Sequence, residues 1–150
     1  MPRQEDRDGP TPVERFRFTL EVPNPSGEGF HLHNLAIAEI LYGARNAYLA
    51  RVGVDWAAMI AGGTNLVIRQ VTIDFEGEVG EGVPLRSGVR AANRSNRTLT
   101  LEEVLWAPGT GLVVARARSL HVSVRLEPPA AVELPADLWA RIEQFEAGGG

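Results

Sequence analysis

The stretch from Asn34 to Val52 constrains the fold of this chain more than any other part of the sequence. It reads NLAIAEILYGARNAYLARV, contains no proline and is followed at once by Gly53. At about 100° per residue, an amphipathic helix gathers its apolar side chains on one face. Here that face carries Ile37, Ile40, Leu41, Ala44, Tyr48 and Val52. The opposite face carries Leu35, Glu39, Tyr42, Asn46 and Ala50. Because this second face is only half polar, we expect the helix to be covered on more than one side.

Segments that alternate apolar and polar residues surround this helix, as half-buried strands do. The expected strands span residues 13–22 before the helix and 66–75, 83–92, 97–106 and 112–126 after it. Residues 56–60 predict one further helical turn, and Leu134-Pro135-Ala136-Asp137 opens a short amphipathic helix that runs through Phe145. This order predicts an α+β fold, in which a long central helix is wrapped by a curved antiparallel five-stranded sheet, with a short C-terminal helix.

The length of 150 residues predicts one domain. We expect a disordered N-terminal arm over residues 1–12, a single domain over 13–146 and a disordered tail over 147–150. The net charge of −4 gives no basic surface for nucleic acid. No apolar run approaches the roughly 18 residues that span a membrane. The charged start MPRQEDRDGPTP is unlike a secretory signal, so we expect a cytoplasmic location.

Two residue types are absent from the sequence. The chain has no cysteine, and all 15 of its basic residues are arginine. These absences exclude thiolate nucleophiles, disulfides, cysteine-bound zinc, Schiff-base lysines and a P-loop lysine. His31, His33 and His121 are the histidines that can carry protons near neutral pH. His31 and His33 form a His-x-His pair with no further His or Cys nearby, so we expect neither a metal nor a cofactor.

The run HLHNLAIAEILYGARNAYLARVGVD resembles the central-helix signature of hotdog thioesterases of the 4-hydroxybenzoyl-CoA thioesterase type. The matching positions are His31, Leu32, Asn34, Ala44, Arg45, Tyr48, Leu49, Gly53, Val54 and Asp55. The segment VIRQVTIDFEGEVGEGVPLRSGVRAANRSNRTLTLEEVLW is similar to the second to fourth strands of that family, and LPADLWARIEQF resembles its terminal helix. The resemblance implies a hotdog fold, a homodimer or homotetramer, and hydrolysis of acyl-CoA or acyl-carrier-protein thioesters.

The sequence departs from this family in the loop before the helix. The family carries Asp-x-Asp there, and its second Asp is the nucleophile or general base. In this chain Asn24 and Ser26 take those positions if Phe30 is an insertion, and otherwise Pro25 and Gly27 take them. Some hotdog thioesterases that resemble polyketide-pathway members also lack this acid and are thought to use a held water. The departure leaves open a non-hydrolytic acyl-thioester binding protein, or a dehydratase or isomerase acting on acyl thioesters.

The expected site lies where this loop meets the helix, because the unpaired N–H groups of a helix N-terminus can stabilise an oxyanion. By analogy with the family, the N–H groups from about His31 to Leu35 form the hole. Asn34 is expected to cap the helix. The catalytic candidates are Glu28, His31, His33, Asn34 and Glu39. Glu28 or Glu39 is the candidate base, although Glu28 also fits a solvated loop acid and Glu39 a surface or dimer contact. His31 fits a structural histidine as well as a site residue, and His33 could face the substrate.

Substrate contacts are expected from two places. At the loop and the helix start, the candidates are Ser26, Gly29, Phe30 and Leu35. In the polar hairpin after the third strand, Arg94, Ser95 and Arg97 could hold a nucleotide or phosphopantetheine phosphate, since Arg suits phosphate. Ordinary solvated-turn arginines are the alternative for this hairpin.

The arginines on the apolar face of the last expected strand are predicted to need partners. We place Leu112, Val114, Leu120, Val122, Val124 and Leu126 on one apolar face. Arg116 and Arg118 interrupt that face, and Arg69 does the same in an earlier strand. Such arginines require an ion pair, a subunit contact or a phosphate. His121 is expected to be structural.

Overall fold

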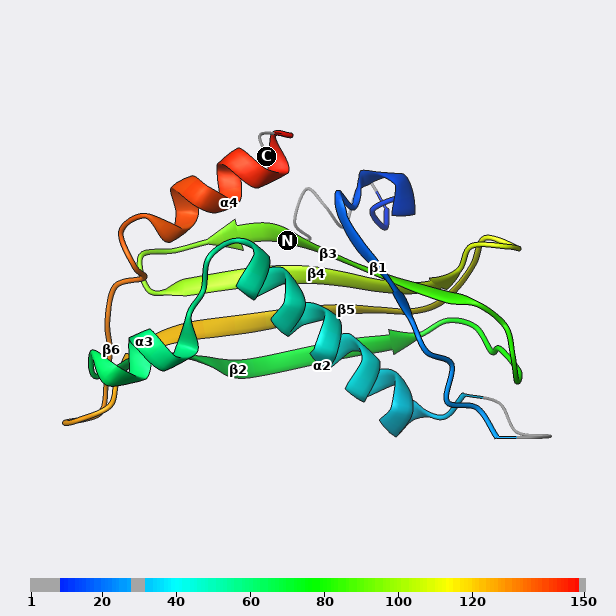
Figure 1. Ribbon diagram of the computed structural model, residues 1–150, viewed down its shortest axis with the longest axis horizontal. Coiled ribbons are helices and arrows are strands. Elements are labelled where there is room, and N and C mark those ends of the chain that lie inside the picture. Colours follow the sequence, from blue (N-terminus) through cyan, green and yellow to red (C-terminus); the bar gives the residue numbers. More distant parts are fainter. Residues whose placement is uncertain (1–8, 28–31, 149–150) are drawn as a thin grey trace.

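The computed structural model describes residues 9–27 and 32–148. Its elements, in chain order, are η1 (Val13–Arg15), β1 (Phe18–Val22), α2 (Asn34–Arg51), α3 (Trp56–Ala61), β2 (Thr64–Phe75), β3 (Leu85–Arg94), β4 (Thr98–Ala107), β5 (Leu112–Arg125), β6 (Ala130–Ala131) and α4 (Leu138–Glu146). The strands form one antiparallel sheet in the order β1-β3-β4-β5-β2, and the short β6 pairs with β5. Figure 1 shows α2 crossing one face of this sheet. The predicted α+β hotdog architecture, with a five-stranded antiparallel sheet, a long central helix and a short C-terminal helix, is confirmed.

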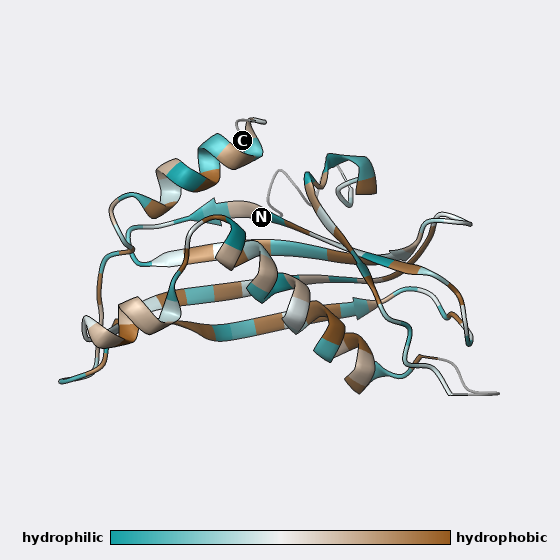
Figure 2. Cartoon of the chain, viewed as in Figure 1, coloured by the Kyte–Doolittle hydropathy of each residue, from teal (hydrophilic) through white to brown (hydrophobic). Residues whose placement is uncertain are grey.

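The helix α2 is held by apolar contacts along its whole length. Ile37 and Leu41 in its first half pack with Leu105 of β4 and with neighbouring residues of β5. Tyr48 and Leu49 in its second half pack against the opposite end of the sheet. Figure 2 shows apolar stretches on both α2 and the strands beneath it. Full burial of a leucine side chain contributes about 1.5–3 kcal/mol, so these contacts, more than helix propensity, hold α2 in place.

A buried ion pair joins the middle of α2 to the sheet. The Arg45 guanidinium contacts Glu103 Oε1 of β4 through Nη2 at 2.6 Å and through Nε at 2.9 Å. The two side chains are 4% and 0% exposed. Because a buried charge must stay with its partner, this pair fixes both the rotation of α2 and its position along the sheet.

The C-terminal end of α2 is anchored by α4. Gly53, with φ of 96°, ends α2 in a left-handed conformation, and a Cβ at this position would lie 2.7 Å from Arg141 Nε. Arg141 of α4 donates from Nε to the Val52 carbonyl at 3.1 Å. Its positive charge lies at the negative end of the α2 dipole, which is a favourable interaction. Tyr48 donates its hydroxyl to Glu146 Oε1 at 2.7 Å.

Two sequence-based predictions about the strands were wrong. The first strand begins at Phe18 and not at Val13, because Val13–Arg15 form a 3-10 turn that places Phe16 over Gly88 on the sheet face away from α2. In β5 the apolar row interrupted by Arg116 was expected to be the core face. The row that faces α2 is instead the alternate one, with Ala115, Ala117, Ser119 and His121. Small side chains on this row let the helix approach closely.

The domain boundaries stay predictions. Of the expected N-terminal arm, residues 9–12 are described, and Thr11 donates its hydroxyl to Glu102 Oε2 of β4 at 3.0 Å. Of the expected tail, residues 147 and 148 are described.

Removing one member of the buried ion pair should destabilise the fold strongly. We expect Arg45→Met to lower the free energy of unfolding by about 3–5 kcal/mol, because it leaves the Glu103 carboxylate buried without its cation. The double variant Arg45→Met/Glu103→Leu should recover most of that loss. Urea denaturation of wild type, Arg45→Met, Glu103→Leu and the double variant measures these values. As a control, Arg86→Met breaks the exposed pair with Glu21 and should cost less than about 1 kcal/mol. Losses that simply add in the double variant would contradict this role of the pair.

Candidate functional site

The N-terminal end of α2 presents free backbone donors to the surface. His33 is the N-cap, and its Nδ1 accepts from Ala36 N at 3.4 Å, so the prediction of Asn34 as the cap was wrong by one residue. Asn34 is the first helical residue and its side chain is exposed. Within the described residues, the N–H groups of Asn34 and Leu35 donate to no other group. The first turn carries no acidic residue, so the positive end of the helix dipole is not neutralised there.

The loop before α2 is held to the sheet by Asn24. Asn24 Nδ2 donates to the carbonyls of Gly80 and Val83 at 2.9 and 3.0 Å. Asn24 Oδ1 accepts from the Ser26 hydroxyl at 2.5 Å and from Ser26 N at 3.0 Å. An amide oxygen cannot take the serine proton, so this arrangement does not activate Ser26 as a nucleophile. Glu28, Gly29, Phe30 and His31 lie outside the described residues.

A groove of about 410 Å³ runs between α2 and β1 and borders this loop. Its walls are mostly apolar and include Leu20, Val22, Pro23, Pro25, Ala36, Ile40 and Gly43. Glu39 is the α2 carboxylate on this groove, and its side chain is exposed. The structure therefore brings Glu39 to the same end of α2 as Asn34 and the loop that carries Ser26. Leu35 lies on the outward side of the helix and is 69% exposed.

A second pocket, of about 450 Å³, lies on the other flank of α2, between that helix, α3 and β2. It is lined by Tyr42, Asn46, Leu49, Trp56, Asn65, Leu66, Val67, Ile68 and His121. His121 was expected to be structural, and the sequence did not predict this pocket. The signal that could have found it is the Ser119–His121 alternation, which places two polar side chains on the helix-facing row of an otherwise buried strand.

His121 is 2% exposed and belongs to a buried polar chain. Its Nε2 lies 2.9 Å from Ser119 Oγ. Burial, and after it the positive charge of Arg45, lower the pKa of His121 to about 4, so its ring is neutral at neutral pH. Burial raises the pKa of Glu103, against the opposing effects of Arg45 and the Ser119 hydroxyl. Since Arg45 stays charged and contacts Glu103 at 2.6 Å, we assign Glu103 as the carboxylate.

The β3–β4 hairpin is at the opposite end of the sheet from the start of α2 (Figure 1). Arg94 packs its guanidinium over the Trp139 ring, 5.1 Å from the ring centre. The Ser95 hydroxyl is bonded within the hairpin, to Thr98 Oγ1 at 2.6 Å. Arg97 is exposed and, with Arg69, borders a shallow depression at this end. Within one chain, the residues expected to bind phosphate therefore lie far from the residues expected to be catalytic.

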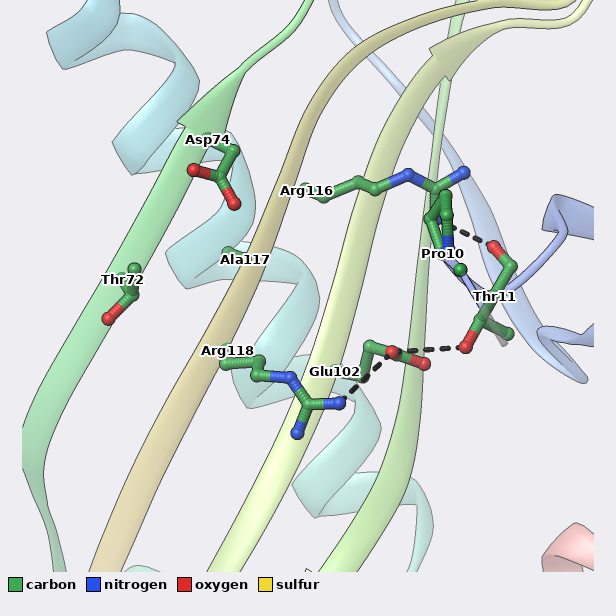
Figure 3. Close-up of a pocket in the computed structure, with 9 residues that line it drawn as sticks. Pro10, Thr11, Thr72, Asp74, Glu102, Arg116, Ala117 and Arg118 are labelled. Atoms are coloured by element: carbon green, nitrogen blue, oxygen red, sulfur yellow. Dashed lines mark hydrogen bonds and ion pairs between the residues drawn. The ribbon is translucent and has the colours of Figure 1, made fainter. Parts of the chain in front are cut away.

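On the sheet face away from α2, a polar pocket of about 330 Å³ contains Arg116 and Arg118 (Figure 3). Arg116 pairs with Glu76 at 3.4 Å and donates to the Thr11 carbonyl at 2.6 Å. Arg118 pairs with Glu102 at 3.6 Å. Of the three alternatives expected for Arg116 and Arg118, which were an ion pair, a subunit contact or a phosphate, the structure shows ion pairs.

Two further findings concern the described residues alone. No three His, Asp or Glu side chains among them gather where they could hold a metal ion. None of their helices combines the length and apolar character needed to cross a membrane.

Comparison with known proteins identifies the family. Residues 15–142 match the thioesterase-like superfamily. The betainyl-CoA thioesterase of Pseudomonas aeruginosa is 24% identical over 113 residues, which are 75% of this chain and 71% of that protein. The chain therefore belongs to the thioesterase-like superfamily and is a thioester hydrolase.

Solved structures share the fold. The 1,4-dihydroxy-2-naphthoyl-CoA thioesterase from Synechocystis superposes with a TM-score of 0.75 at 19% identity, over 86% of this chain and 97% of that one. A thioesterase from Thermus thermophilus, complexed with coenzyme A and Zn, superposes with a TM-score of 0.73 at 22% identity, over 90% of this chain and 98% of that one.

The lowered pKa of His121 predicts a pH dependence of stability. Between about 4 and the unfolded value of 6.5, the unfolded chain binds a proton that the folded chain excludes. The stability that the neutral ring gives to the folded state is therefore complete above pH 6.5. It is lost as the pH falls towards 4, by at most roughly 3 kcal/mol. The raised pKa of Glu103 has the opposite effect, because it favours the folded state at low pH. This effect is the same in wild type and in the His121 variant. Urea denaturation at several pH values should show a smaller loss in His121→Asn. Equal losses in both proteins would contradict the assignment.

Proposed function

We propose that this member of the thioesterase-like superfamily hydrolyses acyl-CoA thioesters, and that two copies of the chain build each active site. The named relatives support CoA as the thiol half. One is a betainyl-CoA thioesterase, one is a 1,4-dihydroxy-2-naphthoyl-CoA thioesterase and one is complexed with coenzyme A. Their acyl groups differ, so the shared CoA half is what carries over to this chain. An acyl-carrier-protein thioester is the alternative substrate.

The observation that carries the proposal is the free N-terminal end of α2, which lies beside the groove between α2 and β1. The thioester carbonyl oxygen would accept hydrogen bonds from the N–H groups of Asn34 and Leu35, at the positive end of the helix. These donors gain strength as charge develops on that oxygen, and one such donor typically contributes about 10²–10³-fold in rate. His33, as the cap, would hold this first turn in position.

Water is the proposed attacking group, because Asn24 occupies the Ser26 hydroxyl. Glu39 is the described carboxylate nearest in sequence to the start of α2, and we assign it as the general base. The carboxylate would take a proton from water as the water oxygen bonds to the carbonyl carbon. The tetrahedral oxyanion then collapses, the carbon–sulfur bond breaks, and the CoA thiolate takes the proton from Glu39 to give free thiol and a carboxylic acid. Glu28 and His31 remain alternative contributors.

A second copy is inferred from the edge of the sheet. β2 is a long strand, and among the described residues it pairs along one side only, with β5, so that its other side is an open edge. On its helix-facing row, Ile68, Val71 and Phe75 are all exposed. An exposed, apolar edge strand is a template for pairing with another chain. A two-fold axis that pairs β2 with β2 of a second copy would bury this row and continue the sheet.

Such pairing would bring the two halves of the site together. The first half of α2 packs near Ile73 of β2, and its second half packs near Leu66. In an antiparallel β2–β2 pair, the Ile73 end of one strand lies beside the Leu66 end of the other. The α2 N-terminus of one copy would therefore face the pocket that contains His121 in its partner.

The same symmetry would bring the hairpin to the site. Thr98, at its base, is in register with Val122 of β5, which is in register with Val67 of β2. The hairpin thus lies at the Leu66 end of β2, which the pairing places beside the α2 N-terminus of the other copy. Arg97, which is exposed, would then be available for a CoA phosphate.

The chain should release free thiol from acyl-CoA thioesters. Glu39→Gln should lower kcat by about 10²–10⁴-fold, because it removes the proton acceptor while keeping the shape of the side chain. Glu143→Gln, a change of an exposed acid on α4, is the matched control and should leave the rate unchanged. A thiol-trapping assay over short, medium, long and aromatic acyl chains measures the rates. Absence of thiol release from every acyl-CoA and acyl-carrier-protein thioester would refute the proposal.

Mixing two inactive variants should restore activity. Glu39→Gln removes the base at one half-site, and Asn46→Trp fills the pocket at the other half. In random mixtures half of the dimers are mixed, and each mixed dimer has one intact site of two, so about a quarter of the wild-type rate should return. A site contained within one chain would leave the mixture inactive. Light scattering checks that both variants dimerise.

A further inference from the structure

The hydrogen-bonding needs of Glu103, Ser119 and His121 point to the nitrogen of His121 that carries the proton. Glu103 Oε1 takes both Arg45 contacts, and Oε2 is buried without a hydrogen-bond partner among the described residues. After Arg45, Ser119 is the other side chain that lowers the pKa of this carboxyl, so its hydroxyl lies beside Glu103. The hydroxyl proton is therefore best directed at Glu103, because a buried carboxylate oxygen requires a donor.

The orientation of the Ser119 hydroxyl determines the tautomer of His121. If Ser119 donates to Glu103, its oxygen must accept the hydrogen bond from His121 Nε2, which lies 2.9 Å away. Nε2 then carries the proton of the neutral ring and Nδ1 is an acceptor. Within the described part of the chain, Nδ1 makes no hydrogen bond, and the ring lines the pocket between α2 and β2.

We infer that His121 is a specificity-determining residue, and that its Nδ1 accepts a hydrogen bond from a hydroxyl group on the acyl chain of the substrate. This inference rests on the proposed function, since it needs the acyl group of one copy's thioester to enter its partner's pocket. Arg45, Glu103 and Ser119 are positioning residues that act through the ring. The other walls, such as Leu49 and Ile68, would pack against the carbon chain.

A neutral ring suits this role. With a pKa of about 4, His121 does not become a cation under working conditions and so remains an acceptor. A hydroxylated acyl group would satisfy Nδ1, whereas a purely alkyl group would leave it buried without a partner. Sites that hydrogen-bond a substrate hydroxyl disfavour the analogue that lacks it for this reason.

The test compares ω-hydroxyacyl-CoA thioesters with matched acyl-CoA thioesters in which a methyl group replaces the hydroxyl. At its optimal chain length the wild type should prefer the hydroxylated substrate in kcat/KM by about tenfold, the effect of one hydrogen bond. His121→Leu should abolish the preference. His121→Asn should retain part of it, because the Asn amide oxygen can stand near the position of Nδ1. Ser119→Ala should weaken the preference, because the ring then loses the hydrogen bond at Nε2 that favours one tautomer.

A second measurement does not depend on turnover. Nitrogen-15 NMR of the wild-type imidazole should show the Nε2–H tautomer of His121 at neutral pH. The Nδ1–H tautomer, or an equal preference in wild type and His121→Leu, would overturn the inference while leaving thioester hydrolysis intact. Failure of the wild type to cleave any of these thioesters would overturn the proposed function and this inference together. Thermal melts confirm that each variant is folded.

Discussion

The rest of the structure depends on the buried contact between Arg45 and Glu103. A guanidinium and a carboxylate out of water must stay together, so α2 cannot rotate or slide on the sheet without breaking the pair. The apolar contacts of Ile37 and Leu41 at one end, and of Tyr48 and Leu49 at the other, supply most of the stabilisation. The pair determines which side chains of α2 face each flank. It therefore positions both Glu39 on one groove and Asn46 on the other.

The position of α2 also explains why one chain holds an incomplete site. The donors of the helix N-terminus lie at one end of the sheet, and the pocket with His121 lies at the other. The distance between them is a consequence of a straight helix that crosses the sheet. The open β2 edge, with its exposed apolar row, offers a way to bring the two ends together through symmetry. In this account the edge strand is as much a part of the function as the helix.

The sequence predicted the architecture well because two strong patterns agreed. The stretch from Asn34 to Gly53 has the period and the termination of a long helix, and the later segments alternate as strands do. The sequence was less informative about faces. In β5, counting apolar residues favoured the row with Val122, whereas the close approach of α2 requires small side chains on the Ala117 row. Period-two alternation identifies two rows without stating which one the helix covers.

The site was less predictable for a related reason. The loop sequence showed that an acid is missing, but the hydrogen bonds that make Asn24 a structural residue connect positions more than fifty residues apart. His121 and Asn46 meet only through tertiary packing. The most direct measurement is a crystal structure with a non-hydrolysable acyl-CoA analogue. The account predicts the carbonyl oxygen at the Asn34 and Leu35 N–H groups of one copy and the acyl chain in its partner's pocket beside His121. An acyl chain bound in the groove between α2 and β1 of a single copy would contradict it.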